Sequence, residues 1–179
     1  PKPLSNMGDI HYLGTFAHNM GKYTAKGQLN TDAGNVQLAT ILHGKNIQGS
    51  INTTDLNLAK VLDNNDFGIV STNIKVEGNT DLSSLTAMGD VSSFYYKGYT
   101  YKNIHLDGSY QNDIFTGKTA INDPNGKLTI DGKATNIMAF LQRKGKLSAD
   151  ISIIADAVNL HKLQLTEALG NRTISFTSK

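Results

Sequence analysis

The sequence has no cysteine, no tryptophan and only three prolines in 179 residues. Without cysteine the chain has no thiolate nucleophile, no cysteine-bound zinc and no disulfide framework. Long apolar runs are also missing: none approaches the ~20 residues of a membrane-spanning helix, and no signal peptide is visible. The net charge is +2 and the lysines are spread singly, so nucleic acid is not an expected partner.

Glycine, with 17 residues, is abundant, as are asparagine, threonine and serine, whereas apolar residues make up 39% and charged residues 18% of the chain. This composition is typical of strands joined by many tight turns, because glycine and asparagine accept the positive φ that such turns require. The length is sufficient for one large domain with a substantial apolar interior. We therefore expect a mostly β fold.

The stretch 99–135 predicts an antiparallel meander of three strands. Apolar and polar residues alternate along each strand, which indicates one apolar and one solvated face. In the second turn Pro124 presets a negative φ and Gly126 accepts a positive one, so this turn is a specific signal for chain reversal. The three strands are expected at 99–107, 115–121 and 127–132.

The rest of the chain predicts the same kind of architecture after a loose lead-in over residues 1–9. Further strands are expected at 10–20, 22–31, 35–42, 46–53, 67–80, 89–97, 147–156 and 173–177. Short helices are expected at 55–62 and 158–165, a helical turn at 136–143, and a crossover or single helical turn at 81–88. The total is about ten strands with two or three short helices. Because a flat sheet of that size curls or splits, we expect a long curved antiparallel meander, as a half-pipe (β-taco), a sandwich or a barrel.

Parts of the chain resemble one another at a separation of roughly 90 to 100 residues, which suits a multi-strand unit used twice. Residues 10–16 align with 104–110, 23–30 with 115–122, and 51–60 with 151–162. This alignment places His11 and His105 at equivalent positions. Residues 10–179 are therefore expected to form a single β domain, or two tandem repeats at about 10–88 and 89–179.

Neither a catalytic motif nor a metal-binding motif is present, and we expect no enzyme activity and no cofactor. Asp63 and Asp66 lack the alternating oxygen donors of a calcium loop and are expected to end a helix. Asp113 and Asp123 are each expected at a turn, where aspartate bonds its own backbone, rather than as a glycosidase pair. No histidine has a second histidine or a carboxylate at ligand spacing; the five are His11, His18, His43, His105 and His161.

One aromatic cluster stands out, around Gly98. Its rings could form a stacking platform for a sugar, the rim of an apolar groove, or cross-strand pairs that stabilise a hairpin. The cluster consists of Phe94, Tyr95, Tyr96, Tyr99 and Tyr101. The first interpretation would make the chain a carbohydrate-binding or adhesive β-domain of a bacterial surface protein; a purely structural spacer is a further alternative.

Three segments resemble TamB-type proteins of the AsmA-like superfamily, especially the Bacteroidetes version. Residues 101–108 (YKNIHLDG), 115–117 (FTG) and 123–128 (DPNGKL) are similar to the Y-x-N-I-x-L-x-G, F-x-G and D-P-N segments of that family. The strand 91–99 fits the one that precedes them, and 156–160 fits the A-D-L-x-x-L helix start, with Val158 and Asn159 departing from it. The resemblance covers about residues 10–165.

The resemblance implies a periplasmic β-taco, a curved sheet whose concave face is an apolar trough, in the bacterial envelope. Such proteins are anchored in the inner membrane by an N-terminal helix. They are associated with phospholipid movement between the membranes and, through a barrel of the Omp85 type, with outer-membrane protein assembly. The chain, which starts at Pro1, would then be an internal slice, with the anchor and the partner-binding parts outside it.

The predicted strands also share one apolar face, which needs a cover because exposed apolar surface costs about 25 cal/mol per Å². A second sheet, the acyl chains of phospholipids, or a groove-to-groove dimer would supply it. The residues expected on this face, as core or as lipid contacts, are Ile47, Ile51, Val70, Ile74, Val76, Ile104, Leu106, Leu128, Ile130, Ile151 and Ile153.

Overall fold

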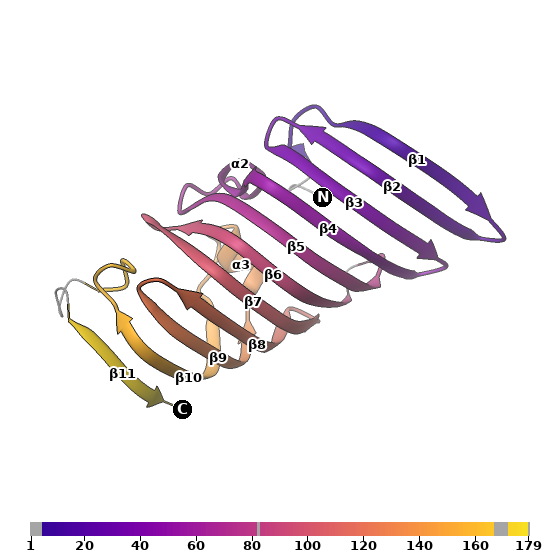
Figure 1. Ribbon diagram of the computed structural model, residues 1–179. Coiled ribbons are helices and arrows are strands. Elements are labelled where there is room, and N and C mark those ends of the chain that lie inside the picture. Colours follow the sequence, from indigo (N-terminus) through magenta and orange to yellow (C-terminus); the bar gives the residue numbers. More distant parts are fainter. Residues whose placement is uncertain (1–4, 82, 167–171, 179) are drawn as a thin grey trace.

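In the computed structural model, which describes residues 5–81, 83–166 and 172–178, the chain forms one open antiparallel sheet (Figure 1). Its eleven strands lie in sequence order, so the expected meander is confirmed. The strands are β1 (His11–Asn19), β2 (Lys22–Thr31), β3 (Gly34–His43), β4 (Asn46–Asn57), β5 (Phe67–Asn79), β6 (Ser84–Tyr96), β7 (Tyr99–Gln111), β8 (Ile114–Asp123), β9 (Gly126–Thr135), β10 (Ser148–Asn159) and β11 (Thr173–Ser178). Two short helices, α2 (Leu58–Leu62) and α3 (Ile137–Leu141), occur among the described elements.

Two of the expected helical segments are wrong. Residues 84–88 belong to β6, because Asp81 accepts a hydrogen bond from the Ser83 backbone N–H (2.9 Å) and closes a turn that leads directly into the strand. Residues 160–164 form turns after β10 rather than a helix. The helix expected at 55–62 is shorter than predicted, since Asp55 lies in a β-bulge at the end of β4 and the helix begins at Leu58.

The sheet is strongly curved (Figure 1), and glycines on its inner face show one cause. Gly108 of β7 lies opposite Gly117 of β8. A Cβ atom on Gly117 would lie only 2.4 Å from the Asp107 carbonyl oxygen, so the two backbones approach more closely there than side chains would permit. Register shifts in the pairings β4–β5, β5–β6 and β10–β11 add further local bending.

Because of this curvature, the two ends of the strands approach each other. We call one the α2 end, with turns at 32–33, 63–66, 97–98 and 124–125, and the other the α3 end, with turns at 20–21, 44–45 and 112–113 and the segment 136–147. The Asn64 side chain donates a hydrogen bond to the Leu141 carbonyl (3.4 Å), and Arg143 pairs with Asp66 at 2.8 Å. The sheet is thus folded into a trough whose rims are joined at this point, with α3 behind β6 and β7 in Figure 1.

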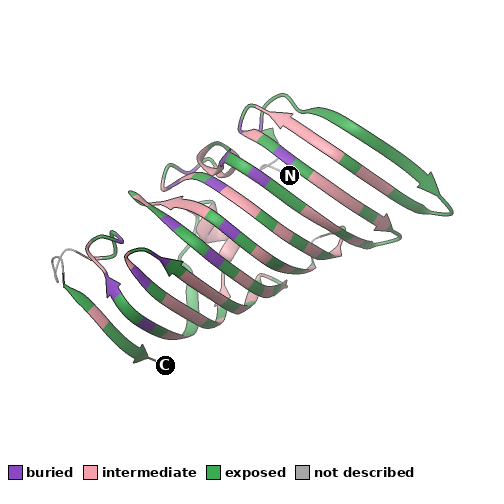
Figure 2. Ribbon diagram, viewed as in Figure 1, coloured by how far each residue is buried: buried purple, intermediate pink, exposed green. Residues whose placement is uncertain are grey.

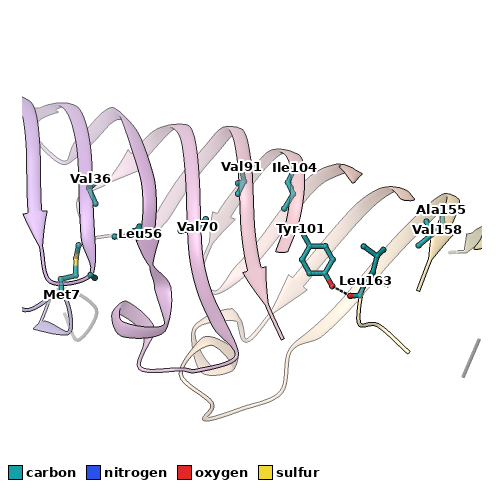
Figure 3. Packing of buried hydrophobic residues seen from close by; sticks show 11 residues of the cluster. Met7, Val36, Leu56, Val70, Val91, Tyr101, Ile104, Ala155, Val158 and Leu163 are labelled. Carbon is teal, nitrogen blue, oxygen red and sulfur yellow. Dashed lines mark hydrogen bonds between the residues drawn. The ribbon is translucent and has the colours of Figure 1, made fainter. Parts of the chain in front are cut away.

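The core is a narrow row on the inner face near the α2 end (Figure 3). It crosses the strands from Met7 and Val36 to Val158 and Leu163, and only the last two side chains are fully buried. The edge strand β1 is exposed along its whole length (Figure 2). Protein atoms therefore cover only part of the apolar face.

Equivalent hydrogen bonds match β3–β5 with β9–β11. The Asn57 N–H donates to Ala33 (2.7 Å) as Asn159 does to Asn125 (2.8 Å). The side chains of Asn57 and Asn159 accept bonds from the backbone N–H three residues later, at 3.1 and 2.9 Å. In each half a serine hydroxyl also accepts a bond from the N–H of the bulge residue, at 3.0 and 2.9 Å.

The strand register extends this match to β1 and β7, but it aligns these two strands with an offset that differs by two residues from the sequence alignment. If Ala33 corresponds to Asn125, the ladder places Tyr12, not Ile10, at the position of Ile104. The equivalence of His11 and His105 is therefore wrong. The expected boundary at 88/89 falls inside β6, and the division into two tandem repeats stays a prediction.

Candidate apolar groove

The inner face is apolar because the register aligns the apolar residues of successive strands. Ile51 of β4 lies opposite Ile74 of β5. Further along the sheet, Ile104 lies opposite Ile121, and Ile121 opposite Leu128. Since side chains alternate between the faces of a strand, these pairs form rows that run across the sheet.

These rows line a groove of about 630 Å³ that extends from β4 to β9. Its volume lies within the range of about 300–1,000 Å³ that is usual for small-molecule sites. Aliphatic and aromatic side chains dominate its walls, and its polar groups are hydroxyls. The lining residues are Ile51, Thr53, Leu56, Leu58, Val70, Thr72, Ile74, Val91, Phe94, Tyr96, Tyr101, Ile104, Leu106, Thr119, Ile121, Leu128, Ile130 and Leu165.

Most of the residues predicted on the apolar face line this groove. Those in its walls are Ile51, Val70, Ile74, Ile104, Leu106, Leu128 and Ile130. The remaining four share the same face outside the groove. Ile47 and Val76 lie closer to the α3 end, and Ile151 and Ile153 lie on the neighbouring strand β10. The shared face agrees with the sequence, whereas contact with lipid stays a prediction for all of them.

The aromatic cluster forms the wall of the groove near the α2 end. Phe94, Tyr96 and Tyr101 line it, and the rings of Tyr99 and Tyr101 meet edge to face with centroids 4.9 Å apart. Tyr95 is separate: its ring packs over Gly68, where an added Cβ would lie 2.5 Å from it. Of the three interpretations of the cluster, the rim of an apolar groove agrees with the position of Phe94, Tyr96 and Tyr101.

Within this cluster the hydroxyls of Tyr99 and Tyr101 form hydrogen bonds inside the protein. Tyr101 donates a hydrogen bond to the Leu163 carbonyl at 2.9 Å (Figure 3). Tyr99 donates to the buried carboxylate of Asp123, which also accepts a bond from the Lys102 backbone N–H (3.0 Å). Burial raises the pKa of both tyrosines, and the Asp123 carboxylate raises the pKa of each further. Both hydroxyls therefore have partners within the protein and keep their protons to a higher pH than a free tyrosine.

The titratable residues considered in the sequence do not assemble into a reactive site. Asp113 lies at the α3 end, where it accepts a bond from the Met138 N–H (3.4 Å), whereas Asp123 lies at the α2 end. His105 pairs with Asp90 at 2.8 Å on the outer face. Among the described residues, no group of three or more histidine or acidic side chains could hold a metal ion. Within the same part of the chain, no helix is long and apolar enough to cross a membrane.

Several lining residues were not identified in the sequence. Ile121 continues the alternation of β8 and could have been found from that pattern. Leu56 was hidden because it follows a β-bulge, which changes the face that the following residues occupy. Leu58 and Leu165 come from the helix α2 and the turns after β10, which only the folded chain brings to the groove.

No protein-family model, curated protein or solved structure matched the chain in the three comparisons. The similarity to TamB-type proteins consequently rests on the sequence motifs described above and stays a prediction. The function of the groove is argued below from its shape, its lining and its hydrogen bonds.

Proposed function

We propose that the groove binds the acyl chains of phospholipids. The chain would act as a non-enzymatic periplasmic segment of a TamB/AsmA-like envelope protein that supports phospholipid transport and, through parts outside this chain, the assembly of outer-membrane proteins with an Omp85-type barrel. The observation that carries this proposal is a groove of about 630 Å³ with an almost purely apolar lining.

The dimensions of the groove suit one extended chain. It crosses the strands from β4 to β9, which is five inter-strand spacings and hence about 24 Å at ~4.8 Å each. One leaflet of a bilayer has a hydrocarbon depth of about 15 Å, half of the ~30 Å core. An acyl chain lying along the trough would therefore be covered over its whole length.

The hydrogen bonds of the lining also favour an acyl chain over a peptide or a sugar. Thr53 Oγ1 bonds to the Val70 carbonyl and lies 3.4 Å from Thr72 Oγ1, and Tyr101 is bonded to Leu163. These groups already have partners within the protein. A peptide or a sugar would bury amides or hydroxyls without such partners, which costs free energy, whereas an acyl chain has none to satisfy.

The exposed part of the inner face supplies the driving force for binding. Ile51 and Ile151 are 38% and 36% exposed although both point to the apolar side. Covering such surface contributes about 25 cal/mol per Å². Because the same rows repeat from strand to strand, successive positions along the trough are similar, and movement along it needs no catalytic group.

A substitution in the groove floor tests the proposal. Ile130→Asp places a charge among the lining residues, whereas Thr129→Asp places the same charge on the outer face of β9. Circular dichroism would establish that both variants fold, and titration with a fluorescent phospholipid would measure uptake. We expect Ile130→Asp to lose uptake and Thr129→Asp to retain it. Equal uptake by two folded variants, or a lipid-free dimer that covers the groove, would contradict the proposal.

A further inference from the structure

The tip of the β1–β2 hairpin presents an exposed apolar side chain in a strained backbone conformation. Met20 is 93% exposed and has a φ of 48°, in the left-handed region, followed by Gly21 with a φ of 74°. Such two-residue turns favour asparagine or glycine at the first position, because a side chain like that of methionine is disfavoured at positive φ. Met20 is thus unfavourable in two ways: its backbone is in the left-handed region, and its apolar side chain is exposed to water.

The β6–β7 turn places Lys97 (φ 45°) before Gly98 in the same conformation, so a long side chain at this position is not confined to one hairpin. Met20 differs from Lys97 in that its side chain is apolar and almost fully exposed. At the same α3 end, the β3–β4 turn consists of Gly44 and Lys45 and the β7–β8 turn of Asn112 and Asp113, all of them ordinary turn residues. The positive φ of Asn112 (51°) is close to that of Met20. A backbone outlier that carries an unfavourable residue at an exposed tip indicates a functional constraint.

Further apolar and basic residues lie near Met20 along the same hairpin and in the adjacent turn. Phe16, on β1, is 66% exposed, and its ring lies 6.0 Å from that of Tyr23. Lys22 follows the turn directly, and Lys45 lies in the adjacent turn. The carboxylate of Asp81 lies near Lys45. From residue 10 to residue 31 the sequence contains no aspartate or glutamate.

We propose that this tip, formed by Phe16, Met20, Lys22 and Tyr23, is a membrane-contact site that docks the protein on an anionic phospholipid surface. Apolar side chains would enter the interfacial region while lysine approaches the lipid phosphates. The tip lies at the far right of Figure 1, away from α2 and α3.

The tip is continuous with the groove along the inner face. Tyr23 of β2 pairs with Leu42 of β3, which pairs with Ile47 of β4. On the same face of β4, Ile47 is followed by Gly49 and then by Ile51, which lines the groove. A chain that leaves the bilayer at the tip would therefore stay on apolar surface. This entry role rests on the proposed function, whereas membrane contact itself does not.

The test is the partitioning of the purified protein onto vesicles, measured by flotation. On phosphatidylglycerol–phosphatidylcholine vesicles, Met20→Asn should bind about tenfold less than the wild type, because one apolar anchor is lost. It should also unfold at a higher temperature, since asparagine suits the left-handed position. Lys22→Gln should weaken binding to these vesicles by about fivefold. The control Met88→Asn, at a methionine 52% exposed on β6, should change binding little.

Equal binding of Met20→Asn and the wild type, or wild-type protein that does not bind anionic vesicles, would overturn the membrane-contact site. The two proposals can fail separately. Ile130→Asp should still bind vesicles, and Met20→Asn should still take up a fluorescent fatty acid supplied in solution. Vesicle binding without any uptake would contradict the acyl-chain groove and leave the membrane contact standing.

Discussion

Arg143 lies 2.8 Å from the carboxylate of Asp66 and so joins two segments at opposite ends of the strands. The second link at this place is the hydrogen bond from Asn64 to Leu141. Both contacts connect residues 77 positions apart. They hold the segment after β9 against the turn before β5 and thereby join the two rims of the trough.

Opening this contact should change the rate of lipid exchange more than stability. The side chains of Arg143 and Asp66 are 54% and 37% exposed, and such pairs contribute about 0–1 kcal/mol. We expect Arg143→Gln to take up and release a fluorescent phospholipid faster, with little change in unfolding midpoint. Asp90→Asn, which breaks the His105 pair on the outer face, is the matched control. Identical exchange rates in both variants would show that the bridge does not restrict access.

The turn between β8 and β9 should not tolerate a side chain at Gly126. Its φ is 147°, and an added Cβ would lie 2.6 Å from Val158 Cα. We expect Gly126→Ala to lower the free energy of unfolding by about 2–3 kcal/mol, measured by denaturant titration. Gly44→Ala also has a positive φ but meets no atom within 4 Å, so it should lose only about 1 kcal/mol. A similar loss in both variants would mean that β10 does not pack against this turn.

Stability should fall at alkaline pH because burial raises the pKa of Tyr101 above its ordinary 10.0. In the unfolded chain the phenol loses its proton near pH 10, whereas in the folded protein it keeps it to a higher pH. The folded state then binds more protons, so this contribution is complete below pH 10 and is lost as pH rises through the folded-state pKa. The thermal unfolding temperature, measured across this pH range, should fall less steeply for Tyr101→Phe than for the wild type. Part of the pH dependence should remain in the variant, because the pKa of Tyr99 is raised as well. An unchanged slope would contradict the assignment.

The internal match of the two halves predicts unequal effects of removing the equivalent asparagines. Each accepts a backbone N–H bond, but Asn159 is buried and Asn57 is only half-buried. Asn57→Ala should lower the free energy of unfolding by about 1 kcal/mol and Asn159→Ala by about 2–3 kcal/mol. Denaturant titration measures both. A negligible effect of Asn159→Ala would contradict the structural role of its hydrogen bonds at the end of β10.

Local signals predicted most strands well. The strand predicted at 22–31 coincides with β2, because alternation and flanking turn residues are both readable within ten positions. The bulges were not predictable in this way, since Asp55, Asn103 and Ala157 adopt positive φ within strands although none is glycine. At Asp55 the bulge changes the period, and the following Leu58, Val61 and Leu62 made the end of β4 resemble the start of a helix.

The site was predictable in part for the same reason. Within regular strands the alternation correctly placed Ile74 and Ile130 on one face. The bulge in β6 puts Val91 and Phe94 on the same face although they are three positions apart, so alternation alone could not decide whether the aromatic cluster shares the aliphatic face. The contact between residues 64 and 141 arises from curvature accumulated over several strands, and no local pattern encodes it.

Mass spectrometry of an organic-solvent extract from the purified protein tests acyl-chain binding most directly. We predict phospholipid in stoichiometric amount from the wild type, with its loss in Ile74→Asp, which alters a lining residue in β5. The variant should retain the circular dichroism spectrum of the fold. A lipid-free wild-type monomer that also takes up no fluorescent phospholipid would contradict the proposal and favour a β-domain that acts as a binding module or spacer.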